Sequence, residues 1–409
     1  MIRHQVYFDT LGSLKEDSAS WRSVFAGLSV LRLIDAYVDL APGAASSSWA
    51  QLHSVRSAVD EIHEGDPVRG VLGCVIDEVT TRCTVDDTVC AALLSYGRAL
   101  DYEASWGLAT DVFATVARVA KPEKNPRLAV EATIAVGGAA RRNGDWEVSA
   151  RAYSQAAYLA DTLGDRQGVL TVQVGIANTY IAKGNLPQAK VILDDVIVQA
   201  RDQNLPEVEG FALHSRAALA HRLGDKAGVV KLAYEALNLT KAAATRDAVL
   251  EELAIGFSEL GMHDAARDAH LILAATAQAK WVRWQATINL MELASIEGME
   301  SAFTAYATEL RHAPIGPWLK SYFLLFLGEG FARFGRDDEA NQALAEAIDF
   351  SALNQIHPVT FKAESAVVAL RAADRRPAAT PPTFHQPTEE VLAAATAISG
   401  LRQVALART

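Results

Sequence analysis

The 409-residue chain has few cysteines and no long apolar run, and each shortage excludes a class of protein. Its three cysteines, Cys74, Cys83 and Cys90, form no C-x-x-C pair, so no disulfide framework is expected. We interpret them as small buried residues of a cytoplasmic protein in a reducing environment. No segment has the length and apolar character of a membrane span, and the first 17 residues lack the apolar core of a signal peptide.

Basic residues are also in short supply, and catalytic motifs are missing. The chain has 38 lysines and arginines against 49 acidic residues, a formal charge of −11, which argues against nucleic-acid binding. No phosphate-binding loop is present, and no nucleophile stands with an associated base. We therefore expect a protein that is not an enzyme, with no cofactor and no metal site.

The most regular feature of the sequence is a turn that recurs at fixed spacing. Segments with helix-like apolar periodicity flank each turn, and successive turns are 40, 40, 40, 37, 37 and 37 residues apart. Such a period is typical of helical repeat arrays, in which each hairpin buries its apolar face against its neighbours. The turns lie at Ala104, Gly144, Gly184, Gly224, Gly261, Gly298 and Gly335.

Small and large residues recur at fixed positions around these turns. A shift of 40 residues superimposes Gly97 on Gly137 and Phe113 on Tyr153. A glycine on the first helix of a hairpin permits close approach, and an aromatic residue on the second helix fills the space behind it. The sequence therefore predicts hairpins with closely packed helices.

This pattern resembles tetratricopeptide repeats over about residues 90 to 350. The resemblance implies a right-handed α-solenoid of stacked antiparallel hairpins whose first helices line a concave groove. The repeats exceed the usual 34 residues, so longer helices or loops are expected, and His270 and Phe303 replace the usual tyrosine or alanine. The alternative is an ordinary α-helical bundle. The positions that carry the resemblance are Ala177, Tyr180, Gly184, Asn185, Ala189 and Leu193 in one copy, and Gly328, Phe331, Gly335, Ala340, Leu344 and Ala347 in another.

The rest of the chain surrounds the array. Residues 1–88 are expected to form a helical region, either a cap or a dimerisation unit, that is irregular up to about residue 18 and has helices over 19–40, 49–62 and 68–82. About seven hairpins follow over 89–350, then a terminal helix within 351–373. Four prolines predict an extended linker over 374–387, and Thr388 is expected to cap a final helix within 388–409.

Polar residues on the first helices are candidates for binding a protein or peptide partner. A basic and an acidic segment in one groove would orient a charged peptide, although a solvated helix surface gives the same pattern. His214 and His221 are seven residues apart, too far along a helix to share one metal ion. The groove candidates are Arg141, Arg142, Asn178, His214, His221, Arg222, Glu251, Glu252, Ser258, Asn289, Glu292, Glu329 and Arg333.

Two further sets of residues suggest other functions. Trp281 and Trp284 are either binding anchors, as in a sensor of a small ligand or peptide, or core residues. The apolar stripe of the final helix must be buried, on its own array or on a second copy in a self-assembling homo-oligomer. The leading hypothesis is a scaffold or adaptor with a binding groove. The oligomerisation candidates are Val391, Leu392, Ala395, Ile398 and Leu401.

Overall fold

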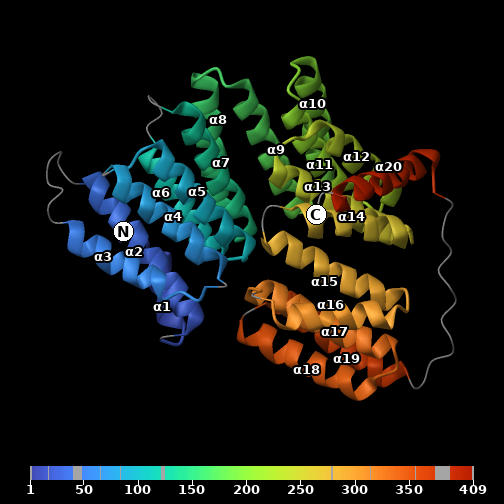
Figure 1. Cartoon of the computed structure of the whole chain (residues 1–409). Helices are drawn as coiled ribbons and strands as arrows, with labels where there is room; N and C mark the ends of the chain where they lie inside the picture. Colours follow the sequence, from blue (N-terminus) through green and yellow to red (C-terminus); the bar gives the residue numbers. More distant parts are fainter. Residues whose placement is uncertain are drawn as a thin grey trace. The chain divides into compact units, whose positions relative to one another are not determined.

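The computed structural model describes a chain built from α-helices (Figure 1). It covers residues 2–16, 18–39, 48–64, 66–82, 84–120, 125–277, 280–313, 315–354, 356–373 and 387–407, and within these ranges there are twenty helices and no strand. Helices adjacent in sequence pack against each other in pairs, so the predicted all-α solenoid of helix hairpins is confirmed. The chain divides into two compact units, residues 1–192 and 193–409, each described separately below.

The first unit has one continuous apolar core that extends from the N-terminal helices into the first hairpins. Tyr7 and Tyr96, both fully buried, join these two parts through a 3.0 Å hydrogen bond between their hydroxyl groups. The region before residue 89 therefore shares its core with the array. The helices are α1 (Gln5–Ser13), α2 (Ala19–Asp39), α3 (Ser48–Asp60), α4 (Pro67–Arg82), α5 (Asp87–Tyr102), α6 (Trp106–Val119), α7 (Pro126–Arg142), α8 (Trp146–Thr162), α9 (Arg166–Ala182) and the start of α10 (Leu186–Asp202).

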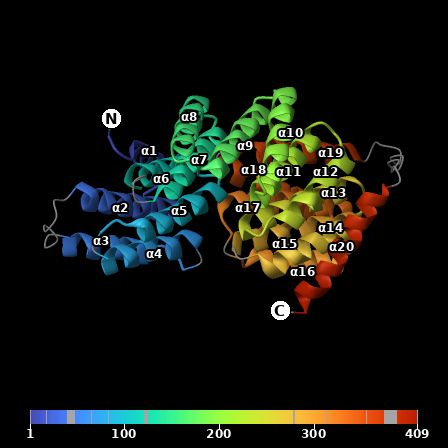
Figure 2. The ribbon, with the colours of Figure 1, turned by 90° about the horizontal axis from the view of Figure 1, so that it is seen from above.

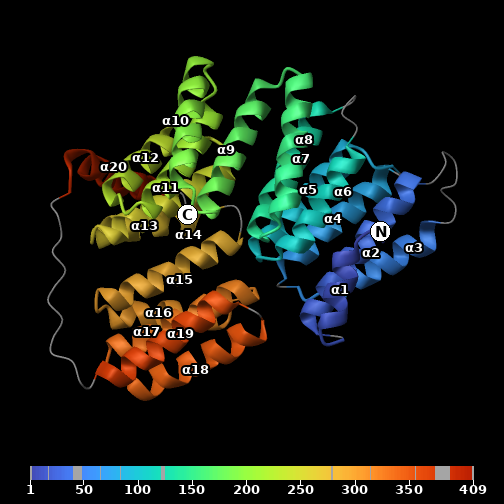
Figure 3. The ribbon, with the colours of Figure 1, turned by 180° about the vertical axis from the view of Figure 1, so that it is seen from behind.

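The second unit continues the hairpins and ends with a helix that packs back on them. Its two apolar clusters involve mainly α11–α15 with α20, and α15–α19, a path that can be followed in Figure 3. The helices are α11 (Pro206–Arg222), α12 (Lys226–Leu239), α13 (Ala243–Glu259), α14 (His263–Thr276), α15 (Lys280–Ile296), α16 (Glu300–Arg311), α17 (Pro317–Arg333), α18 (Asp337–Leu353), α19 (His357–Ala373) and α20 (Glu389–Leu406).

All seven predicted turns have left-handed backbone. The φ angle is 55° at Ala104 and between 71° and 79° at the six glycines, as a tight helix end requires. After Gly144, Gly184 and Gly224 the next residue caps the following helix, whereas Ser105 after Ala104 does not. At the first of these glycines the Asp145 carboxylate accepts a 3.0 Å hydrogen bond from the Val148 amide. The Gly-Asp pair thus ends one helix and begins the next.

The difference between repeats of 40 and 37 residues lies mainly in the second helix of the hairpin. The first helices α7, α9, α11, α13, α15 and α17 all have 17 residues. The second helices α8 and α10 also have 17, whereas α12 and α14 have 14 and α16 has 12. The exception is α6, which has 14 residues in the 40-residue repeat that begins at Ala104. The second helices thus differ in length by about one helical turn, while the first helices keep the same length.

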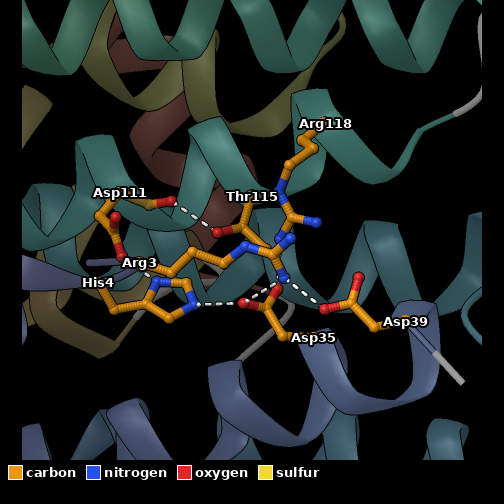
Figure 4. A network of polar contacts seen from close by, with 7 residues as sticks. All are labelled: Arg3, His4, Asp35, Asp39, Asp111, Thr115 and Arg118. Atoms are coloured by element: carbon orange, nitrogen blue, oxygen red, sulfur yellow. Dashed lines mark hydrogen bonds and ion pairs between the residues drawn. The ribbon is translucent and has the colours of Figure 1, made fainter. Parts of the chain in front are cut away.

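The N-terminal segment differs from the prediction. Residues 1–18 were expected to be irregular, but Gln5–Ser13 forms α1. His4, with a φ of 61°, precedes the helix and is buried between Asp111 and Asp35 (Figure 4). Its Nδ1 lies 2.6 Å from Asp111 Oδ2, and its Nε2 lies 3.3 Å from Asp35 Oδ2, at ion-pair distance although not in hydrogen-bond geometry. Arg118 also pairs with Asp35. These tertiary contacts hold a short helix that local sequence does not specify.

The C-terminal helix lies on the second helices of its own chain, against α14 and α12 (Figure 2). Thr388 caps it as predicted, and Val391 and Ile398 are buried in the cluster formed with α11–α15. Arg402 Nη1 donates a 2.8 Å hydrogen bond to Asp268 Oδ1 on α14. Most of the predicted proline-rich linker, residues 374–386, lies outside the described residues. Among the helices described, none has the length and apolarity to cross a membrane.

Candidate functional site: a cavity on three first helices

The first helices of three successive hairpins, α13, α15 and α17, line a cavity of about 470 Å³ in the second unit. This volume is in the range of pockets that bind small ligands or single side chains. The cavity combines polar groups, aliphatic groups and three aromatic rings. Its lining residues are Glu251, Ala254, Ile255, Ser258, Glu259, His270, Gln285, Ile288, Asn289, Glu292, Leu293, Ile296, Trp318, Leu319, Tyr322 and Phe326.

Carboxyl groups dominate the polar part of the cavity. Glu251 and Glu259 belong to α13 and Glu292 to α15, and the lining described includes neither lysine nor arginine. The Gln285 side-chain amide donates a hydrogen bond to the Glu251 carboxylate, which joins α15 to α13. The lining therefore carries three carboxyl groups and no cation of its own.

Burial changes the protonation of these acids. It raises the pKa of Glu251 from 4.5 to about 7, and the neighbouring Glu252 charge adds to the effect. Burial also raises the pKa of Glu292 to about 7, with Arg333 and Lys362 opposing the shift and Glu329 supporting it. Near neutral pH both groups are consequently poised between the acid and the carboxylate, and a nearby positive charge would ionise them.

The aromatic part of the cavity comes from one face of α17. Trp318, Tyr322 and Phe326 are four residues apart, so they follow one another along the same face of the helix. The ring centroids are 5.4 Å apart for the first pair and 5.9 Å for the second, with the planes tilted by 57° and 52°. Lys362 of α19 lies over the Tyr322 ring, 5.5 Å from its centroid. This wall thus already accommodates a cation at one ring.

One buried polar group in the lining lacks a hydrogen-bond partner. His270 of α14 is 6% exposed, and its Nδ1 has no partner among the described residues. Burial lowers the pKa of this imidazole from 6.5 to about 4, so it is neutral near pH 7. Buried polar groups are nearly always hydrogen-bonded, so this nitrogen is an exception within the residues that border the cavity.

The structure brings several of the predicted groove residues together and separates others. Glu251, Asn289 and Glu292 line the cavity, and Glu252 follows Glu251 on α13. On the preceding first helix, α11, His221 Nδ1 lies 3.4 Å from the lining residue Glu259, whereas the neighbouring Arg222 is exposed.

The remaining groove candidates lie elsewhere. Burial lowers the pKa of His214 on α11 to about 4, so it carries no positive charge near neutral pH. Arg141, Arg142 and Asn178 belong to the first unit. Arg141 is partly buried beside Tyr153, and burial lowers its pKa. Arg142 forms a bidentate pair with Asp101, at 2.8 Å from Nε and 2.5 Å from Nη2. Arg142 is therefore already engaged within the fold.

The predicted aromatic anchors differ from those found at the cavity. Trp281 and Trp284 are half-buried on α15 and pack against the apolar core, and neither lines the cavity. Trp318, Tyr322 and Phe326 were not predicted from the sequence, because they lie in the very apolar segment 314–331, which is typical of a helix buried on most sides. The repeat register contains the missing signal: Tyr322 and Phe326 stand 37 residues after the lining residues Gln285 and Asn289.

A second cavity in this unit fits a ligand less well. It measures about 530 Å³ and is bordered by α16, α17 and α18. Arg311 and Lys320 face Glu339 and Glu346 in its lining, so charges of both signs offset one another. None of its lining residues carries a buried polar atom without a partner. The cavity on α13, α15 and α17 is therefore the stronger candidate.

No protein-family profile matches the sequence, and no curated protein is similar to it. Within the described residues, no group of three or more histidine, cysteine, aspartate or glutamate side chains is arranged to hold a metal ion.

Proposed function

We propose that this chain is a tetratricopeptide-like scaffold or adaptor that binds a protein or peptide partner and catalyses no reaction. The observation that carries the proposal is the cavity on α13, α15 and α17, since these are the first helices that the family resemblance assigns to the binding face. Clustered aromatic residues beside polar groups are typical of interface anchors. The two described cysteines, Cys74 and Cys90, are free thiols, which supports a cytoplasmic location.

Selection of peptides on the full-length protein tests this function. A displayed library of random peptides is enriched on immobilised wild type, and the winners are measured against Trp318→Ala and Tyr322→Ala. We expect at least a tenfold loss of affinity in both variants, because each removes a ring from the cavity wall. Phe361→Ala is the matched control, since Phe361 is 66% exposed on α19 and does not line the cavity. Peptides that bind both cavity variants as tightly as wild type would refute the assignment.

Self-assembly through exchange of α20 is the second candidate. The observation in its favour is that α20 covers an apolar face of α12 and α14, held also by a 2.9 Å ion pair between Lys231 and Glu390. Another copy of the helix would fit the same face. Deletion of residues 377–409 tests this candidate: exchange predicts a smaller assembly in native mass spectrometry, and an unchanged subunit count excludes it.

A further inference from the structure

We propose that the cavity on α13, α15 and α17 binds a guanidinium or alkylammonium group, as carried by an arginine or lysine side chain of a partner peptide. This inference rests on the proposed function and adds to it the chemical class of the ligand. It is argued from the charge of the lining, the aromatic wall and one unsatisfied buried nitrogen.

The first argument is the match of groups. A buried organic cation requires carboxylates for its charge and hydrogen-bond acceptors for its N–H groups. Glu251 and Glu292 supply the charge, and Asn289 supplies an amide oxygen from the same helix as Glu292. The faces of Trp318 and Tyr322 suit the flat guanidinium or the alkyl stem.

The second argument is His270. His270 belongs to the lining, and its buried Nδ1 has no hydrogen-bond partner among the described residues. A neutral imidazole has one nitrogen that accepts a hydrogen bond, and a cation bearing several N–H donors can satisfy it. An anionic ligand would meet the carboxyl groups of the lining, so the lining disfavours anions.

The third argument is the balance of charge around the cavity. Burial and the Glu252 charge raise the pKa of Glu251. Burial also raises the pKa of Glu252, with the His221 charge of α11 opposing the shift and Glu259 supporting it. Near Glu292, Arg333 directs its Nη1 to Ser295 Oγ at 2.8 Å and its Nη2 to Glu329 at 3.3 Å, and Lys362 lies over Tyr322. Both cations oppose the raised pKa of Glu292, but neither of them lines the cavity, whose lining has three glutamates.

A cation in this cavity would displace protons. Because the pKa values of Glu251 and Glu292 are raised to about 7, each is partly protonated at neutral pH. Binding of a positive charge favours the ionised forms, so protons are released to the buffer. The release should fade at pH 9, where both groups are already ionised.

The test compares a cationic probe with its neutral isostere on the full chain. Isothermal titration calorimetry measures N-acetyl-arginine amide, N-acetyl-citrulline amide and methylguanidinium, each in phosphate and in Tris. We expect the arginine probe to bind at least tenfold more tightly than the citrulline probe. The binding enthalpy should differ between the two buffers at pH 7, and this difference should vanish at pH 9. Methylguanidinium separates a free small cation from a peptide side chain as the source of the ligand.

Variants locate the binding and separate the two proposals. Glu251→Gln with Glu292→Gln should abolish arginine binding and proton release, whereas Glu364→Gln, an exposed position on α19, should change neither. Equal binding of citrulline, or unchanged binding by the double variant, would overturn the cation assignment. If no probe binds but selected peptides without arginine or lysine still require Trp318 and Tyr322, the cation assignment is wrong and the recognition function stands. If the selected peptides also bind Trp318→Ala and Tyr322→Ala as tightly as wild type, both the cation assignment and the recognition function are wrong.

Discussion

The ring of Tyr153 occupies the space where Gly137 would carry a side chain: its Cε1 atom lies 2.8 Å from the ideal Cβ position. The same ring stands 2.4 Å from the corresponding position at Gly175, on the first helix of the next hairpin. Tyr153 thus packs against the glycines of two successive first helices. The relationship recurs at Gly97 with Phe113 and at Gly328 with Leu344. Close approach at these small residues sets the distance between the two helices of each hairpin, and Gly328 does so for α17, which lines the candidate site.

Addition of one methyl group at these glycines should destabilise the first unit. Gly137→Ala and Gly175→Ala place a Cβ against the Tyr153 ring, and relief of such an overlap costs about 1–3 kcal/mol of unfolding free energy. The measurement is thermal and urea unfolding. Gly73→Ala is the control, because nothing lies within 4 Å of its Cβ position on α4. The control should gain up to about 1 kcal/mol through helix propensity. Equal effects at the three positions would disprove the packing account.

The left-handed turn at Ala104 offers a stabilising substitution. An L-residue with a φ of 55° is strained, and glycine removes the strain, so Ala104→Gly should raise the unfolding free energy by about 1 kcal/mol. Ala91→Gly, at an exposed position inside α5, should instead lower it by about 1 kcal/mol. Chemical denaturation of both variants checks the opposite signs. A loss of stability in Ala104→Gly would contradict the turn geometry.

The raised pKa of Glu251 predicts that replacement of its carboxyl group by a neutral amide stabilises the fold, and that the gain depends on pH. Because the native pKa of about 7 exceeds the ordinary 4.5, the native state holds the proton more tightly, and stability falls as pH rises through this window. Glu251→Gln should match wild type near pH 4.5 and exceed it by about 2 kcal/mol at pH 8, after allowance for partial solvent access. Unfolding curves at several pH values measure this difference. Glu364→Gln should parallel wild type, and a constant offset for Glu251→Gln would contradict the predicted shift.

Because α20 packs on its own chain, substitutions at two of its apolar positions should differ in whether they detach the helix. Ile398 is fully buried and Leu392 is 49% exposed, so Ile398→Asp should detach the helix whereas Leu392→Asp should not. Hydrogen–deuterium exchange of residues 389–406 should rise at least tenfold in the first variant alone. Equal exchange in both variants would show that α20 does not dock through this face.

The sequence predicted the features that single residues determine. The turn glycines require left-handed backbone, and Thr388 stands directly before the apolar stripe of α20, so the turns and this helix start could be located without coordinates. It did not predict α1, whose position depends on contacts of His4 with Asp111 and Asp35, distant in the chain. The cavity escaped prediction for a similar reason, because its residues come from four helices and meet only through stacking of the hairpins.

The most direct test of the central claim is hydrogen–deuterium exchange of the full chain with and without a peptide selected on it. If the cavity on α13, α15 and α17 is the recognition surface, the peptide should slow amide exchange mainly in these three helices. This protection should disappear in Tyr322→Ala. Protection confined to α20, or to helices outside the cavity, would contradict the account.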